Sequence, residues 1–139
     1  MKLVLDSSVV LSALLEDEQA AYARLIIHQL KQSEVHGVVP GLFLTETANG
    51  LLMAQRRGRL DKEKLTLLLK ALSIMPFERV ELPDVAQTTA LAQKHQLTVY
   101  DATYLHIALR EGVPLASLDG DLRKAALAEG VYYQSARSQ

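Results

Sequence analysis

Two aspartates stand where an α/β protein could carry out chemistry. Asp6 and Asp119 each follow a short apolar run, residues 3–5 and 115–118, that is typical of a buried strand. An acid at such a corner often caps the next helix, and for either residue alone capping is the simpler explanation. Because ligands bind beyond the carboxyl ends of parallel strands, the two aspartates together indicate a shared site.

A glutamate in the interior of an expected helix adds a third acid. At 100° per residue, Glu46 lies on a stripe that also carries an amide and two apolar side chains: Asn49, Leu42 and Met53. The adjoining Gly50 would allow another backbone to approach closely. If the helix is instead rotated so that other apolar residues face the core, Glu46 stays in water, and this alternative is open.

A fourth acid, Asp101, begins the helix expected over residues 101–111. Leu105 and Ala108 lie four and seven residues later, so Asp101 heads the apolar face of that helix. It is either another N-cap or a partly buried carboxylate. A buried carboxylate needs a partner, because an unpaired charge in the protein interior is costly.

Convergence of these four acids would have a chemical consequence. No Lys or Arg occupies a matching position on the buried stripes. Two carboxylates about 5 Å apart repel by about 3 kcal/mol at an effective dielectric constant of ~20. Four of them would hold protons at raised pKa values or bind a divalent cation, and oxygen ligands without Cys or His favour Mg²⁺ or Mn²⁺. Such a site suits phosphodiester hydrolysis.

Other catalytic motifs are absent from the sequence. There is no Cys, no Gly-rich phosphate loop and no Gly-x-Ser-x-Gly elbow. The four histidines form no i, i+4 pair, and His106 is better explained as a core residue than as a base. The net charge of −1 does not decide the partner, although basic residues gather in one stretch: Arg56, Arg57, Arg59, Lys62 and Lys64. That stretch is either a solvated surface or a phosphate-contacting one.

Short apolar runs alternate with helical patterns along the chain. Strands are expected at residues 3–5, 35–39, 77–82, 113–118 and 131–133, and helices at 8–15, 18–32, 42–57, 61–73, 84–95, 101–111 and 121–129. Asp61 is expected to cap the helix at 61–73. The alternation predicts an α/β fold with a mostly parallel sheet covered on both faces. The length suits a single domain over residues 1–139, and no apolar stretch is long enough to span a membrane. We therefore expect a soluble, cytoplasmic protein with no membrane partner.

Four stretches together resemble the PIN-domain ribonucleases, most closely the VapC-type toxins of prokaryotic toxin–antitoxin pairs. They are LDSSVV at residues 5–10, ETAN at 46–49, YDATYL at 100–105 and SLDGDL at 117–122. The resemblance covers essentially the whole chain, in order and at the expected spacing. It implies a three-layer α/β/α sandwich with a five-stranded parallel sheet of order 3-2-1-4-5, in which the first and fourth strands are neighbours.

The same resemblance implies an endoribonuclease in which four catalytic acids ligate one or two Mg²⁺ or Mn²⁺ ions: Asp6, Glu46, Asp101 and Asp119. Ser8, Asn49 and Ser117 would orient these ligands without contacting the metal themselves. Asp121 is a further candidate ligand, although capping of the last helix explains it equally well. Family members usually carry Thr where this chain has Ser117, a change that keeps the hydroxyl.

The resemblance also implies partners. It suggests an RNA substrate, a homodimer, and a VapB-type antitoxin that lays a segment across the acidic cleft. Arg56, Arg57 and Arg59 are our candidates for contacts with RNA phosphates. Two alternatives remain: a PIN-fold nuclease that processes RNA without acting as a toxin, and a non-catalytic scaffold that binds RNA or protein. A scaffold would be marked by loss of acids, and here all four are present.

Overall fold

Four parallel strands form the centre of the protein. The computed structural model describes residues 1–15 and 20–134. The strands are β1 (Lys2–Leu5), β2 (His36–Pro40), β3 (Glu78–Val80) and β4 (Leu115–Ala116), and their order is β3-β2-β1-β4. In the register, Leu3 pairs with Gly37 and Val4 pairs with Leu115, so β1 lies between β2 and β4. The expected parallel sheet is confirmed, as is the placement of the fourth strand beside the first.

The expected fifth strand does not form, and this part of the fold prediction is wrong. Residues 131–133 contribute one isolated parallel bridge, between Tyr132 and Leu115. The strand predicted over 113–118 is likewise shortened to two residues. Pro114 has no N–H to donate, and β4 offers the last segment too little edge for a longer ladder. The sheet therefore has order 3-2-1-4 in place of 3-2-1-4-5.

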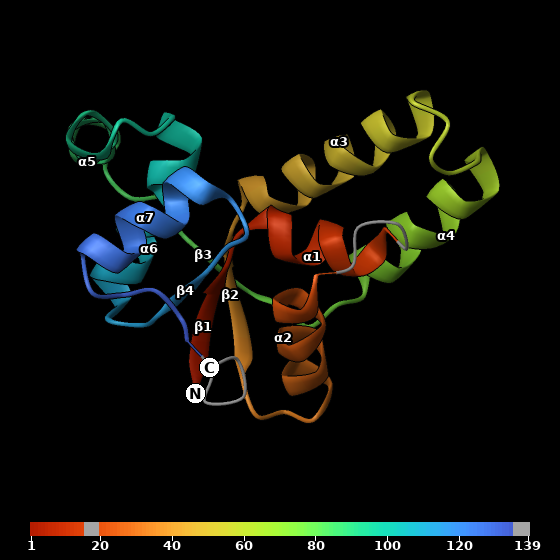
Figure 1. Ribbon diagram of the computed structural model, residues 1–139, viewed down its shortest axis with the longest axis horizontal. Coiled ribbons are helices and arrows are strands. Elements are labelled where there is room, and N and C mark those ends of the chain that lie inside the picture. The colour runs from red at the N-terminus through yellow and green to blue at the C-terminus, as the bar shows by residue number, and fades with distance from the viewer. Residues whose placement is uncertain (16–19, 135–139) are drawn as a thin grey trace.

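Helices cover both faces of this sheet, as Figure 1 shows. On one side lie α1 (Ser7–Leu14), α2 (Ala21–Lys31), α3 (Leu42–Arg56) and α4 (Lys62–Ser73), and on the other lie α5 (Val85–His95), α6 (Val99–Glu111) and α7 (Gly120–Ala128). The ends of α3 and α4 that face each other project beyond the sheet. The expected layered arrangement is confirmed. In the described ranges, no helix is long and apolar enough to cross a membrane.

Sequence signals set several helix ends. The side chain of Asp61 accepts a hydrogen bond from Lys64 N and caps α4, as predicted. Gly58 and Gly112 have φ angles of 77° and 66° and end α3 and α6 in a conformation that favours glycine. The helix predicted over 18–32 is confirmed as α2 from Ala21 onward, and the first part of that prediction lies outside the described residues.

A buried core joins the sheet to the helices. Leu3 and Leu5 of β1 are fully buried and belong to one apolar cluster with Ile26 of α2, Phe43 of α3 and Leu105 of α6. These residues recur at the intervals that a buried strand and one face of a helix require. The core therefore fixes the positions of β1, α3 and α6, the elements that lead to Asp6, Glu46 and Asp101.

Close packing of α1 against α3 depends on Gly50. A Cβ atom at this position would lie 2.5 Å from Leu11 Cδ1, which is closer than real Cβ contacts allow. A close approach at Gly50 does occur, but the group that approaches is the side chain of Leu11 and not the backbone expected from the sequence. Because α1 follows Asp6 and α3 carries Glu46, this contact helps to set the distance between the two acids.

Candidate active site at the carboxyl edge of the sheet

Asp6 follows β1 directly and is held by two serines. Its Oδ2 accepts hydrogen bonds from Ser8 Oγ and from Ser117 Oγ, each at 2.7 Å. The residue occupies the N-cap position of α1, but its side chain makes no capping hydrogen bond. Capping is therefore not what the carboxylate does. Asp6 is only 3% exposed, so both hydroxyls act on a carboxylate that is almost completely removed from water.

This burial has an electrostatic cost. Desolvation raises the pKa of Asp6 above its usual value, even though Ser8 and Ser117 stabilise the charged form and lower it. Repulsion from Asp119 raises the pKa further. The two strand-end aspartates are therefore near enough to interact, as their positions in the sequence predict.

Asp119 has two roles at the start of α7. Its Oδ1 accepts a hydrogen bond from Leu122 N at 2.9 Å, so the capping explanation is correct for this residue. Its own backbone N–H donates to Ser117 Oγ at 3.0 Å. Ser117, fully buried, therefore connects the backbone of Asp119 to the side chain of Asp6. Ser117 thus contacts Asp6, one of the acids that it is predicted to orient.

Glu46 lies beside the buried face of α3. The side chains that face the core are Phe43, Thr47, Leu51 and Ala54. The expected stripe is thus displaced, but Glu46 is half-buried, and its Oε1 accepts a hydrogen bond from Tyr104 Oη at 2.8 Å. Desolvation raises the pKa of Glu46, the hydrogen bond from Tyr104 lowers it, and repulsion from Asp6 raises it again.

Asp101 belongs to the first turn of α6. The N-cap is Thr98, whose Oγ1 accepts from Asp101 N at 3.1 Å, so the capping alternative for Asp101 is wrong. Burial is the largest cause that raises its pKa to about 6, followed by repulsion from the three other acids: Asp6, Asp119 and Glu46. The other three acids that the sequence singled out therefore all interact electrostatically with Asp101, although the four come from separate elements.

Nothing in the described chain neutralises these four acids. Among residues 1–15 and 20–134, no ion pair joins any of them to a Lys, Arg or His side chain. The pKa values of Asp6, Glu46 and Asp101 are raised, first by burial and then by repulsion from neighbouring acids, so their negative charges are costly in this structure. The charge and the hard oxygen donors fit a divalent cation such as Mg²⁺.

The geometry limits how such an ion would be held. In the part of the chain that the structure describes, no three acidic or histidine side chains come close enough to enclose a metal directly. Mg²⁺ usually keeps several waters and binds through one or two carboxylates, so an acidic cluster of this kind does not need to form a closed cage. The residues present therefore fit a hydrated divalent ion better than a structural metal.

The remaining predicted residues differ in where the structure places them. Asn49 follows Glu46 by almost one helical turn and is exposed. Asp121 is exposed and lines a separate pocket of about 340 Å³ with Lys94 and Lys124. It does not cap α7, because Asp119 does.

The predicted RNA contacts lie farthest from the acids. Arg56 and Arg57 are exposed at the distal end of α3, and Arg59 follows them. At 1.5 Å per residue, the ten residues from Glu46 to Arg56 span about 15 Å of helix. The arginines are therefore not next to the acidic cluster.

Sequence reasoning missed Tyr104. An aromatic residue at this spacing looks like a core residue, and its ring is indeed fully buried. The available signal was its position three residues after Asp101, which puts both on one side of α6. Burial and the hydrogen bond to Glu46 raise the pKa of Tyr104 well above its usual range, so its hydroxyl remains protonated. By contrast, His106 pairs with Thr88 Oγ1 at 2.8 Å, as expected of a core histidine.

Comparison with known proteins identifies the fold and its family. The sequence matches the PIN domain family over residues 3–127. The chain belongs to the PIN-domain family. It is 33% identical over 129 residues to Ribonuclease VapC3 of Pyrobaculum aerophilum, covering 88% of this chain and 92% of that protein. It is 30% identical over 103 residues to Exonuclease VapC9 of the same organism, covering 74% and 73%. These relatives place it among the VapC-type PIN domains.

Solved structures agree with this assignment. PAE2754 from Pyrobaculum aerophilum superimposes with a TM-score of 0.70 at 26% identity, covering 90% of this chain and 79% of the other. FitAcB from Neisseria gonorrhoeae has a TM-score of 0.64 at 19% identity, covering 89% and 92%. The second similarity supports the PIN fold alone.

Proposed function

We propose that this PIN domain is a Mg²⁺- or Mn²⁺-dependent endoribonuclease that hydrolyses phosphodiester bonds in RNA. The observation that carries the proposal is the grouping of Asp6, Glu46, Asp101 and Asp119 without an ion pair to a Lys, Arg or His side chain in the described part of the chain. A purely structural cluster would be expected to include a base, because uncompensated charge destabilises the fold. The name of the relative Ribonuclease VapC3 supports RNA as the substrate.

The roles follow from the positions of the side chains. The four acids would hold one or two divalent ions, which when bound supply positive charge beside the phosphate and lower the pKa of water. Ser8 and Ser117 hold Oδ2 of Asp6 and so fix the plane of its carboxylate. We leave Asp121 outside the ligand set, because it lines the pocket with Lys94 and Lys124.

The biological role that we propose is that of a toxin neutralised by a VapB-type antitoxin. Support comes from the two VapC relatives. We further propose that residues 1–139 act as one domain, that the protein is a cytoplasmic homodimer, and that Arg56, Arg57 and Arg59 bind RNA phosphates away from the cut. A nuclease that processes RNA without a toxin role would share the same site, and growth arrest on expression, relieved by the antitoxin, separates the two.

The test is cleavage of purified transfer and ribosomal RNA by the antitoxin-free protein in Mg²⁺, in Mn²⁺ and in EDTA. The variants are Asp101→Asn and, as a matched control, Asp121→Asn, because each aspartate lies in the first turn of its helix. We expect discrete fragments that require metal, disappear in Asp101→Asn and persist in Asp121→Asn. Metal-independent cleavage, or full activity in Asp101→Asn, would contradict the proposal.

One relative is named an exonuclease, so the mode of cleavage needs its own test. A circular RNA has no ends, and only an endonuclease can open it. We expect the circle to be linearised in Mn²⁺ at a rate comparable to that of a linear RNA of the same sequence. Degradation of the linear RNA alone would assign the exonuclease activity to this site.

A further inference from the structure

The four acids differ in what holds them in place. Asp6 is fixed by two serine hydroxyls, and Asp119 is fixed by its capping bond to Leu122 N. Asp101 has a short side chain on the first turn of a helix whose backbone is capped by Thr98. Glu46 has the longest side chain of the four, and it accepts a hydrogen bond from the side chain of Tyr104.

Tyr104 is suited to fix Glu46. Its ring is fully buried within the main apolar cluster, so the position of its hydroxyl is set by the core. That hydroxyl donates to Glu46 Oε1 at 2.8 Å across the gap between α6 and α3. A free glutamate side chain loses roughly 1.5–2 kcal/mol of conformational entropy when it is ordered. A partner that already orders Glu46 reduces the conformational entropy that this side chain loses when a metal binds.

The chemistry of the donor also matters. A neutral hydroxyl orients the carboxylate without cancelling its charge, whereas a Lys or Arg at the same place would compete with a cation. The hydrogen bond occupies one oxygen of Glu46 and leaves lone pairs for a ligand. Because Tyr104 lies three residues after Asp101 on α6, the same helix positions two of the acids at once.

We propose that Tyr104 is a positioning residue of the metal site, which orders Glu46 for binding a divalent cation. The inference rests on the proposed function, since it takes the acidic cluster as the cation site. The hydrogen bond from Tyr104 is thus the counterpart of the serine bonds to Asp6. Partners of this kind, one step removed from the metal, typically change metal affinity by ~10–100-fold.

The first experiment measures Mn²⁺ binding to the full chain by the electron paramagnetic resonance signal of free Mn²⁺. Tyr104→Phe keeps the ring and removes only the hydroxyl. The matched control is Tyr133→Phe, which removes another buried tyrosine's hydrogen bond, 3.0 Å to Gln29 Oε1, away from the acids. We expect about tenfold weaker Mn²⁺ binding in Tyr104→Phe and wild-type binding in Tyr133→Phe.

A double-mutant cycle shows whether the effect passes through Glu46. In a Glu46→Gln background, adding Tyr104→Phe should weaken Mn²⁺ binding by less than about twofold, because the carboxylate that Tyr104 orients is already gone. RNA cleavage at limiting Mn²⁺ should fall with the binding and recover at saturating Mn²⁺, with KM for RNA unchanged. A tenfold loss that persists in the Glu46→Gln background would overturn the positioning role.

A third measurement uses the wild-type protein, in case Tyr104→Phe does not fold. The chain has five tyrosines, and labelling them with ¹³C at Cζ gives each a separate resonance. Titration with Mg²⁺ should shift the Tyr104 resonance with the midpoint of metal binding and leave Tyr133 unmoved. Either of two results would refute this inference and leave the proposed metal site standing. One is Mn²⁺ binding that Asp6→Asn abolishes but Tyr104→Phe leaves intact. The other is a Tyr104 resonance that does not shift when Mg²⁺ is added. Absence of Mn²⁺ binding in the wild type would refute both this inference and the proposed metal site.

Discussion

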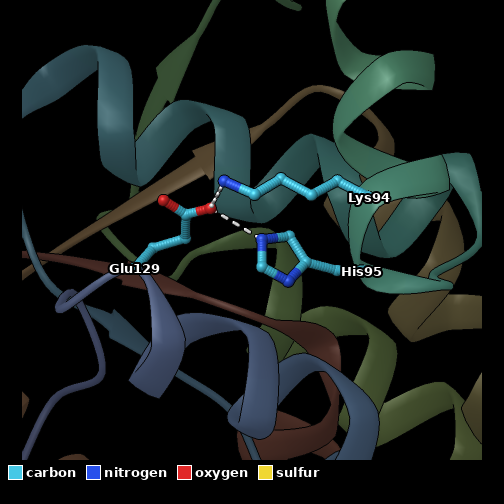
Figure 2. A network of polar contacts seen from close by, with 3 residues as sticks. All are labelled: Lys94, His95 and Glu129. Atoms are coloured by element: carbon cyan, nitrogen blue, oxygen red, sulfur yellow. Dashed lines mark hydrogen bonds and ion pairs between the residues drawn. The ribbon is translucent and has the colours of Figure 1, made fainter.

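An acidic residue stands at each end of α7, and the two have opposite electrostatic surroundings. At the C-terminal end, Glu129 Oε2 lies 2.6 Å from His95 Nε2 and 2.9 Å from Lys94 Nζ (Figure 2). The hydrogen bonds from His95 and then Lys94 hold the pKa of Glu129 below its usual value. At the N-terminal end, Asp119 lies near two other acids, Asp6 and Asp101, and its repulsion raises the pKa of both.

This difference distinguishes a structural cluster from one kept for a ligand. Lys94 and His95 end α5, so their contacts with Glu129 join two helices within the protein itself. The acidic cluster has no such internal partner among the described residues, so its charge opposes folding in the absence of the divalent cation that we propose it binds. The functional site that we propose thus lies at the end of α7 where acidic side chains have no ion pair among the described residues.

The largest expected effect separates the two clusters by activity. Asp6→Asn should lower RNA cleavage at least about a thousandfold, because charge stabilisation by a metal site is worth several kcal/mol and each 1.4 kcal/mol is tenfold in rate. Glu129→Gln should leave cleavage within about twofold of wild type. Circular dichroism establishes that both variants fold. Comparable losses of activity in the two variants would remove the distinction between the clusters.

The next expected effect is on stability. Mn²⁺ at about one hundred times its dissociation constant should raise the free energy of unfolding by roughly 2.7 kcal/mol, if it binds the folded state alone. Thermal unfolding followed with and without EDTA measures this. Glu129→Gln should keep the full stabilisation, and Asp6→Asn should lose most of it. Equal stabilisation of both variants would mean that the ion binds elsewhere.

A smaller effect concerns the protein without metal. The folded-state pKa of Asp101 is raised from 3.8 to about 6, so its ionisation opposes folding increasingly as the pH rises from about 4 to 6. Asp101→Asn should therefore stabilise the metal-free protein by about 1 kcal/mol at pH 8, after allowance for solvent screening at this half-exposed position. The gain should vanish near pH 4. Urea unfolding in EDTA at both pH values tests the sign, and destabilisation at pH 8 would contradict it.

Much of the fold could be predicted from local patterns. The helix expected over 42–57 is observed over Leu42–Arg56, and Asp61 caps α4 as predicted, because periodicity and capping depend on neighbouring residues. The lengths of the last strands could not be predicted from local patterns. The apolar run at 113–118 has the composition of a strand, but the length of β4 depends on pairing with distant segments.

In the candidate site, too, the features set by local sequence could be predicted, whereas those set by tertiary contacts could not. Asp6 and Asp119 could be identified from the sequence because an acid directly after a short apolar run is either a helix cap or part of a site at the strand ends. The structure brings the two residues near enough to interact. The N-cap of α6 was misplaced by three residues, because Thr98 competes with Asp101 for that role and the sequence does not rank them. Tyr104 was missed because its ring packs in the core while its hydroxyl serves the site, and only the tertiary contact with Glu46 reveals the second role.

The smallest predicted effect has the opposite sign to that of Asp101→Asn. The lowered pKa of Glu129 means that its charge stabilises the fold above the unfolded-state value of 4.5, and that this contribution is lost as the pH falls through the folded-state pKa. Glu129→Gln should cost about 0.5 kcal/mol at pH 7 and nothing in strong acid. Urea unfolding with and without 1 M salt measures it, and the penalty should shrink in salt. If Glu129→Gln instead stabilised the protein at pH 7, both ends of α7 would carry uncompensated charge, and compensation would no longer tell the structural cluster from the functional one.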